Sequence, residues 1–545
     1  RNVYKYANYK YVAQYQAIRK VLRENNDIDT LLFSVKDQNL RHALGQVKNR
    51  NSDFQKLDVS NSNVSIKTRG LLRYILNFLK GFAYILRLVL WSNLANFYSK
   101  NTETGAERDN RVALLSYFPF YDSRAAKTNK FSNLYYFPLQ EYLNTEGMKH
   151  SWLFMYAQIR GFTYLDSLRI AKRIVQNQYL FLEENISFRD MILVSRIWLQ
   201  QCLKYWLLRK KIFNKSFFKD VDDIERIYIK NSLDDSFIGI PVLSGIYYYV
   251  AFKNYSKRTK NQKLLIYLNE MQTWERACNA ALQKYSPNTL RIGFQHTSVA
   301  KNLFHYFSEL NNAKNSYFSE PLPDYFAVNG HMGYEQLKKS YSNRLILVEA
   351  LRQLNQQKTT LPFSSVDEID KLTNQIVYVG SYDKNEAYKI FELIVETFKF
   401  NKNYKIVVVS HPSRDLSKLV DLANKKYDCT IESGNKSLND YLSESRVAIV
   451  GSSTTAVDAV RHFCKIIVPL FPDHIILSPL LGFDDFFEYV TSSDELLMQV
   501  NTLMEYRYKQ KDFETVKQFI NDFWLLDPNL TQWKNIIDNA LNSSQ

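Results

Sequence analysis

The chain has 545 residues, of which 46% are hydrophobic and 23% are charged. This balance is typical of folded globular proteins and excludes a disordered or fibrous chain, and the length predicts two or three domains. The net charge of +16 leaves two kinds of partner open, nucleic acid or an anionic membrane surface.

The first 105 residues are predicted to form a helical, membrane-associating region. Residues 1–50 are polar and helical in pattern, and residues 51–66 form an Asn/Ser-rich linker. Residues 71–91 follow as an amphipathic helix. Its polar face carries Arg73, Asn77, Lys80 and Arg87.

The cations of this helix indicate whether it would span a membrane or bind at its surface. Three of them argue against a spanning helix and favour one that lies in the interface, and a second basic segment with a tryptophan follows at 193–211. Core helices whose cations reach solvent are the alternative for both segments. The distribution of the basic residues favours the membrane over nucleic acid, and no RNA-reading motif is recognisable. No signal peptide is recognisable either.

Two series of strands predict an α/β fold with two Rossmann-like domains. The first domain, 106–335, is expected to bind the acceptor and to contain a basic helical insertion at about 158–260. A helical connection at 336–372 leads to the second, nucleotide-sugar-binding domain at 373–545. Strands are predicted at 112–116, 152–156, 264–268, 291–294 and 325–328, then at 375–379, 405–409, 447–450 and 465–469, with helices at 132–146 and 385–399.

Two strands of the second domain end in residues suited to a phosphate. Ile406–Val409 is followed by Ser410, His411 and Pro412, and Val447–Val450 by Gly451, Ser452, Ser453 and Thr454. Ligands bind beyond the carboxyl ends of parallel strands, so we expect the imidazole and the hydroxyls to meet in one crevice. Backbone N–H groups where a helix begins would add to it, as would Gly380 after the preceding strand. A histidine that only ends a strand is the alternative for His411.

The order of these motifs resembles bacterial GT-B glycosyltransferases that use CMP-activated ulosonic acids, the sialyl-, Kdo- and pseudaminyl-transferase group. The segments 266–276, 292–298 and 323–330 resemble its surface-polysaccharide branch, so the resemblance covers about residues 265–460. The family's Gln-His-Gly reads Gln295-His296-Thr297 here. Without that glycine, a ligand cannot approach the backbone of this loop as closely.

The resemblance implies an enzyme that transfers an ulosonic acid from a CMP-linked donor to a lipid-linked capsule or lipopolysaccharide glycan. It is closest to the retaining Kdo transferases, which implies Asp383 as the nucleophile, Glu270 acting on the acceptor hydroxyl, and His411 with Ser452 and Ser453 holding CMP. The resemblance also implies a peripheral enzyme on the cytoplasmic face of the membrane.

Other residues around the cleft have two interpretations each. His296 enters a loop from a buried strand, where a polar ring favours a catalytic role. Gln295, Glu275 and Arg276 are candidates for the acceptor side, although Glu275 and Arg276 could instead pair with each other. Asp383 could be an Asx turn at a helix start, and Glu270 a carboxylate that stabilises the following helix.

No metal or cofactor is expected. The one Asp-x-Asp triplet, Asp27-Ile-Asp29, precedes an apolar run instead of following one, and the four cysteines are too widely scattered for a zinc site or a disulfide framework, which favours a reducing, cytoplasmic setting. Phosphate charge would then be neutralised by His411, by hydroxyls and by Arg414 or Lys465.

Two other functions remain open. A CDP-polyol phosphotransferase of the teichoic-acid type also has a GT-B-like fold and also binds a cytidine nucleotide with histidines. A non-catalytic basic module that binds nucleic acid or membrane is the alternative from another class, and it predicts salt-sensitive binding with no nucleotide in the cleft.

Overall fold

The structure is a computed structural model that describes residues 70–100, 111–159, 161–175, 179–213, 223–307, 321–341, 343–355, 361–369, 373–412, 414–427, 429–471 and 474–542. The predicted helices of residues 1–50, the linker at 51–66 and the Asp27-Ile-Asp29 triplet lie outside the described residues, as does the side chain of Arg73.

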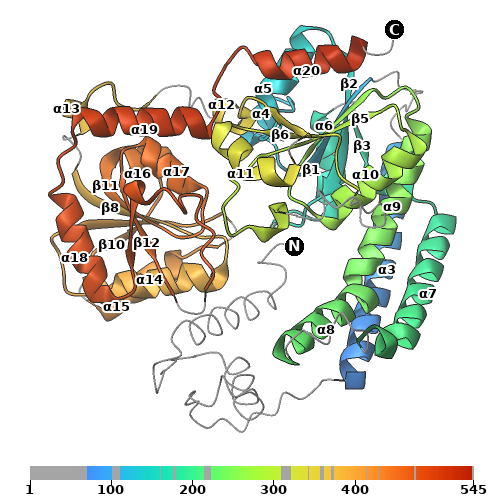
Figure 1. Cartoon of the computed structure of the whole chain (residues 1–545), viewed down its shortest axis with the longest axis horizontal. Helices are drawn as coiled ribbons and strands as arrows, with labels where there is room; N and C mark the ends of the chain where they lie inside the picture. Colours follow the sequence, from blue (N-terminus) through green and yellow to red (C-terminus); the bar gives the residue numbers. More distant parts are fainter. Residues whose placement is uncertain are drawn as a thin grey trace. The chain divides into compact units, whose positions relative to one another are not determined.

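The first sheet has seven strands in the order β3-β2-β1-β4-β5-β6-β7 (Figure 1). Their bounds are β1 Val112–Phe118, β2 His150–Tyr156, β3 Tyr179–Phe181, β4 Leu264–Leu268, β5 Leu290–Phe294, β6 Tyr325–Val328 and β7 Leu345–Leu347. β1 pairs in parallel with both β2 and β4. The strand order therefore changes direction between β1 and β4. We call this position the first switch point; in such sheets, ligands bind there, beyond the carboxyl ends of the strands.

The second sheet has six strands in the order β10-β9-β8-β11-β12-β13. Their bounds are β8 Thr373–Val379, β9 Lys405–Val409, β10 Ile431–Ser433, β11 Ser445–Val450, β12 Lys465–Pro469 and β13 Phe487–Val490. β8 is parallel to β9 and to β11, so its switch point lies between β8 and β11. The predicted α/β class with two Rossmann-like domains, the components of a GT-B fold, is confirmed.

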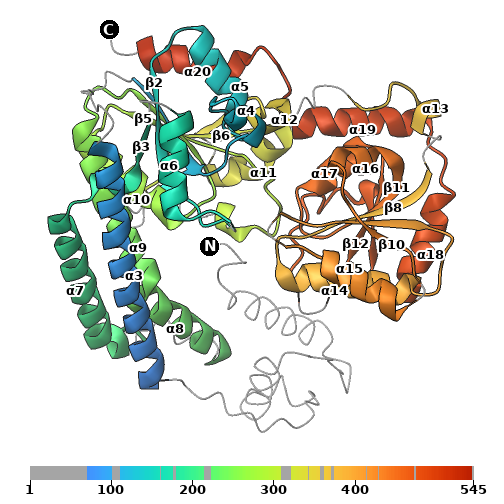
Figure 2. The same cartoon turned by 180° about the vertical axis from the view of Figure 1, so that it is seen from behind.

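Helices cover both faces of the second sheet. One core joins its strands to α14 (Lys384–Phe398), α15 (Ser417–Lys426) and α18 (Ser493–Met504). The other joins them to α16 (Leu438–Glu444), α17 (Thr455–Arg461) and α19 (Gln510–Phe523), as Figure 2 also shows. β11 is buried along its whole length, which explains the apolar run at Val447–Val450.

The remaining helices belong to two compact units, one of which holds both sheets except for most of β3. With the sheets are α4 (Ser123–Lys127), α5 (Phe137–Thr145), α6 (Tyr164–Ile174), α11 (His331–Tyr341), α12 (Leu351–Asn355), α13 (Val366–Ile369) and α20 (Thr531–Asn542). The other unit contains α3 (Gly70–Lys100), α7 (Phe188–Phe213), α8 (Asp223–Ile238), α9 (Ile240–Arg258) and α10 (Thr273–Tyr285).

Two predicted segments need correction. The connection at 336–372 was predicted to be helical but contains β7, whereas the insertion at about 158–260 is largely helical, as predicted, and also supplies β3. The second domain was predicted to extend to residue 545, but the last helix, α20, packs against the first sheet. There the indole of Trp533 packs edge-on against Phe294 of β5, with ring centroids 5.7 Å apart.

Candidate active site

The first switch point carries a carboxylate, an imidazole and a phenol at the ends of three adjacent strands. Glu270 follows β4, His296 follows β5 and Tyr117 is the penultimate residue of β1. Glu270 Oε1 lies 3.2 Å from His296 Nε2, and the Tyr117 hydroxyl donates to Glu270 Oε2 at 3.4 Å. The two residues predicted to be catalytic in this domain, Glu270 and His296, therefore do lie together.

Burial gives these two residues different chemical roles. The side chain of His296 is only 4% exposed, whereas that of Glu270 is 32% exposed. His296 Nδ1 is buried and has no hydrogen-bond partner among the residues that the structure describes. A buried N–H group without a hydrogen-bond partner is rarer than a buried acceptor without one. The proton of the neutral ring is therefore best placed on Nε2, facing Glu270. The arrangement leaves the carboxylate to meet a substrate and the imidazole to hold that carboxylate in position.

Tyr135 and Arg352 extend this cluster. The ring of Tyr135 packs edge-on against His296, with centroids 5.2 Å apart, and the Arg352 guanidinium carbon lies 5.8 Å from the same ring. Burial raises the pKa of the Tyr135 hydroxyl; the charge of Arg352 acts to lower this pKa and that of Glu270 to raise it. Tyr135 thus lies within the fields of both a cation and a carboxylate.

At the second switch point, His411 follows β9 and packs against β8. A Cβ atom on Gly380 would lie 2.8 Å from the His411 backbone nitrogen, so this glycine permits the close approach of the two strand ends. Burial and the charges of Arg414 and Arg352 lower the pKa of the His411 imidazole below its ordinary value of 6.5. The ring is therefore neutral at pH 7 and offers one N–H donor. The exposed ring of Tyr382 stands edge-on to it, with centroids 5.6 Å apart.

Ser452 is held by a buried carboxylate. Glu386, whose side chain is 3% exposed, accepts from the Ser452 hydroxyl at 2.7 Å and from its backbone N–H at 3.0 Å. His474 Nε2 lies 3.1 Å from the same oxygen, at the distance of an ion pair but without the alignment of a hydrogen bond. Burial acts to raise the pKa of Glu386, but His474 and the hydroxyl of Ser452 outweigh it and lower the pKa below 4.5. Glu386 is therefore ionised and fixes the loop after β11.

The other predicted nucleotide-binding residues have local partners. Ser410 Oγ accepts from Leu416 N at 3.0 Å, and Ser453 Oγ donates to Thr455 Oγ1 at 3.0 Å. Pro412 is exposed. These residues line the strand ends as predicted, while their contact with a nucleotide stays a prediction.

Asp383, the predicted nucleophile, is the N-cap of α14. Its side chain accepts from Glu386 N at 2.9 Å, which is the Asx interaction that the sequence left open. The residue is half-buried at the second switch point. One carboxylate oxygen is thus engaged in capping, and the role of the carboxylate in catalysis stays a prediction.

The residues proposed for the acceptor side are tied to the backbone. Gln295 accepts from Asn329 N at 3.1 Å and donates to the Thr297 carbonyl at 2.8 Å. Glu275 is buried and accepts from the backbone N–H groups of Met271 at 2.9 Å and Gln272 at 3.0 Å. Arg276 is half-buried in the first turn of α10. Glu275 therefore caps α10, and Gln295 fixes the loop that carries His296.

One hydrogen bond and the charge of one arginine connect the strand-end loops of the two sheets within their unit. Ser298 Oγ lies 3.1 Å from Thr454 Oγ1. The charge of Arg352 acts both on Tyr135 beside the first sheet and on His411 of the second. Glu270, Arg352 and His411 therefore belong to one polar region.

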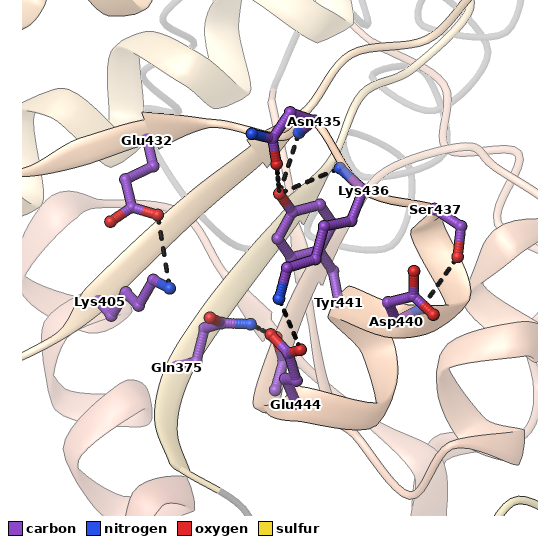
Figure 3. Close-up of polar contacts among 10 residues, drawn as sticks. Gln375, Lys405, Glu432, Asn435, Lys436, Ser437, Asp440, Tyr441 and Glu444 are labelled. Carbon is purple, nitrogen blue, oxygen red and sulfur yellow. Dashed lines mark hydrogen bonds and ion pairs between the residues drawn. The ribbon is translucent and has the colours of Figure 1, made fainter.

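The opposite edge of the second sheet is stabilised by its own polar contacts. Lys405 at the start of β9 pairs with Glu432 of β10 at 3.4 Å. Lys436, which follows β10, pairs with Glu444, which precedes β11, at 2.8 Å (Figure 3). Lys465 also lies at this edge, at the start of β12, with its Nζ 3.4 Å from the Tyr506 ring centroid. The suggestion that Lys465 neutralises a phosphate beside His411 is therefore wrong. Among the described residues, no group of three or more His, Cys, Asp or Glu could hold a metal ion.

Sequence reasoning missed four polar or aromatic residues of the site. Tyr117 could have been found, because it directly follows the first predicted Rossmann strand, 112–116. Arg352 follows β7, a three-residue strand that carries no readable pattern, and Tyr135 lies in a loop between β1 and α5. Glu386 in the first turn of α14 looks like an ordinary helix-start carboxylate until its contact with Ser452 is seen.

Comparisons with known proteins give only distant likenesses. No protein-family model and no curated protein matches the chain. Among solved structures, the glycotransferase of kitacinnamycin is 10% identical over 79% of this chain and 98% of its own, with a TM-score of 0.43. MurG of Acinetobacter baumannii is 11% identical over 79% and 99%, with a TM-score of 0.42. A UDP-GlcNAc 2-epimerase from Neisseria meningitidis, bound to UDP-GlcNAc, is 12% identical over 79% and 100%, with a TM-score of 0.41.

Proposed function

We propose that this protein is a glycosyltransferase that moves an ulosonic acid from a CMP-linked donor to a surface-polysaccharide acceptor. The observation that carries the proposal is the Glu270 carboxylate, held between His296 Nε2 and the Tyr117 hydroxyl at the first switch point and still 32% exposed. A general base must be oriented and able to reach a substrate hydroxyl, and Glu270 meets both conditions.

The charges around His411 support an anionic donor. A CMP-ulosonic acid carries a phosphate and, on the anomeric carbon, a carboxylate. The neutral imidazole of His411 supplies an N–H donor for the phosphate, and the guanidinium groups of Arg352 and Arg414 both act electrostatically on that ring. Arginine binds phosphate and carboxylate groups in a bidentate manner, so two guanidiniums and an imidazole match two anions. The exposed ring of Tyr382 could stack on the cytosine.

The proposed reaction proceeds in two displacements with retention of configuration. The Asp383 carboxylate attacks the anomeric carbon, and the bond from this carbon to the CMP phosphate oxygen breaks, so that CMP leaves with the electron pair. The acceptor hydroxyl then gives its proton to Glu270 and attacks the same carbon, and the bond to Asp383 breaks. His411, Ser452, Ser453 and Thr454 hold the leaving CMP during the first step.

A nucleotide screen tests the proposal. Melting temperatures are measured with CMP, CDP, UMP, UDP, GMP and GDP in EDTA, because a ligand that binds only the folded state raises its stability. We expect the largest increase with CMP. Preference for a uridine nucleotide or a requirement for Mg²⁺ would overturn the donor assignment. Transfer of a polyol phosphate from a CDP-linked donor would establish the phosphotransferase, and salt-sensitive RNA binding without nucleotide binding would establish the basic module.

A further inference from the structure

The apolar side chains exposed on the described residues gather on two helices, α3 and α7. Of the 26 large hydrophobic residues that are exposed in the described ranges, 16 lie on these helices. They include Phe82, Leu86 and Leu90 on α3 and Leu203, Trp206 and Leu207 on α7, each at least 53% exposed. Scattered single residues need no explanation, but a concentration of this kind marks an interaction surface.

The two helices pack antiparallel within their own unit and turn a different face inward. A Cβ on Gly81 of α3 would lie 2.5 Å from the Trp198 ring of α7, and nearer the start of α3 the Arg209 guanidinium lies 4.8 Å from the Tyr74 ring. Figures 1 and 2 show α3, α7 and α9 side by side. The buried stripe of α3 recurs every three or four residues: Gly81, Ile85, Leu88, Ser92 and Ala95. The exposed apolar arc lies on the other side of the helix.

The charges beside this apolar surface are almost all positive. The 31 residues of α3 contain no Asp or Glu, and α7 has six Lys or Arg residues against one acidic residue, Asp190. Arg209 is occupied by an ion pair with Asp234 at 2.9 Å. The exposed cations include Lys80 and Arg87 on α3 and Arg196, Lys204 and Lys210 on α7. We call the exposed apolar and basic residues of these two helices the α3–α7 face.

We propose that the α3–α7 face docks on an anionic lipid bilayer and lies in its interface. A bilayer is the partner that accepts leucine, phenylalanine and tryptophan side chains in its acyl boundary and pairs lysine and arginine with lipid phosphates beside them. An exposed tryptophan such as Trp206 is also typical of the membrane interface. The two segments predicted to meet a membrane, 71–91 and 193–211, lie on α3 and α7, which pack against each other, and the proposal does not depend on the donor or the reaction.

A spanning helix is disfavoured by the same observations. Among the described residues, the Tyr74–Tyr98 part of α3 is long and apolar enough to cross a membrane. The bent pair of α8 and α9 also meets this test if the two helices are counted as one span. However, Lys80 and Arg87 lie in the middle of the α3 segment, where charge is costly in hydrocarbon. The inward stripe of α3 is already packed against protein.

Vesicle sedimentation with the whole protein tests this proposal. The vesicles are phosphatidylcholine alone or with 30% phosphatidylglycerol. We expect binding to the anionic vesicles and a loss of at least tenfold in the partition coefficient for Leu86→Ser with Leu207→Ser. Replacing Lys204 and Lys210 by Gln should lower it about fivefold per charge. Melting temperatures should not change, because all four side chains are exposed.

Matched controls come from the unit that holds the sheets. Leu422→Ser with Met498→Ser removes side chains of similar exposure, 61% and 57%, and Lys418→Gln with Lys425→Gln removes two exposed charges of α15. These variants should bind vesicles as the wild type does. Failure of the wild type to bind anionic vesicles, or equal losses in the controls, overturns the proposal. So does a dimer in sedimentation velocity that Leu86→Ser with Leu207→Ser dissociates while vesicle binding persists, since a second copy would then cover the face.

Discussion

Replacing Glu386 by Gln tests how the loop after β11 is held. The substitution keeps the size of the side chain but removes its charge. Glu386 accepts two hydrogen bonds from Ser452, at 2.7 and 3.0 Å, and a hydrogen bond to a charged group stabilises a protein by roughly 1 kcal/mol more than a neutral one. We therefore expect Glu386→Gln to lower the free energy of unfolding by about 2 kcal/mol at pH 7, or the melting temperature of this domain by about 4–8 °C.

The pH dependence of this difference gives the prediction a second test. The pKa of Glu386 is lowered by folding, so its stabilisation is complete above the ordinary value of 4.5 and is lost as the pH falls from 4.5 through the folded pKa. The melting temperatures of wild type and Glu386→Gln should therefore converge below pH 4.5. Glu392→Gln, an exposed change on the same helix, is the control and should melt as the wild type does. A Glu386→Gln protein as stable as wild type at pH 7 would refute the anchoring role.

Four further substitutions test the site. His411→Ala should weaken CMP binding, measured by calorimetry in EDTA, by about 1.5–3 kcal/mol, and an unchanged affinity would remove His411 from the phosphate site. Asp383→Asn should abolish transfer but keep CMP affinity and melting temperature, since Asn caps helices as well as Asp does; substantial residual activity would transfer the nucleophile role to another acid. Arg352→Gln should raise the KM for the CMP-linked donor at least tenfold with little change in CMP affinity, and equal losses for both would contradict contact with the donor carboxylate. His296→Gln should lower kcat with little change in donor KM, and unaltered kcat would show that His296 does not position Glu270.

The sequence predicted best those strands that are buried and long enough to show an apolar run. The predicted strands at 264–268, 325–328, 405–409 and 465–469 match β4, β6, β9 and β12. β3, β7 and β10 have three residues each and were missed, because so short a run shows no periodicity. β13 has four residues, as β6 does, but Glu488 interrupts its apolar run. The order of the strands within each sheet could not be predicted from the sequence either, because neighbouring strands such as β1 and β4 are far apart in the chain.

In the candidate site too, some residues could be predicted from the sequence and others could not. Glu270, His296 and His411 were predictable because each directly follows a readable strand, and strand ends place their side chains at one edge of a sheet. The hydrogen bonds seen in the structure decide what such residues do. Asp383 caps α14, Glu275 caps α10 and Gln295 bridges two loops, while Arg352 enters the site from a segment with no strand signal.

Intact-mass spectrometry of the Glu270→Gln variant with a CMP-linked ulosonic acid tests the central claim most directly. Because Glu270 is proposed to deprotonate the acceptor, this variant should complete the first displacement and stall at the second. We predict release of CMP and a protein mass increased by one ulosonic acid residue, which maps to Asp383 after proteolysis. Neither CMP release nor a mass increase with CMP-linked donors, together with turnover of a uridine-linked sugar, would contradict the account.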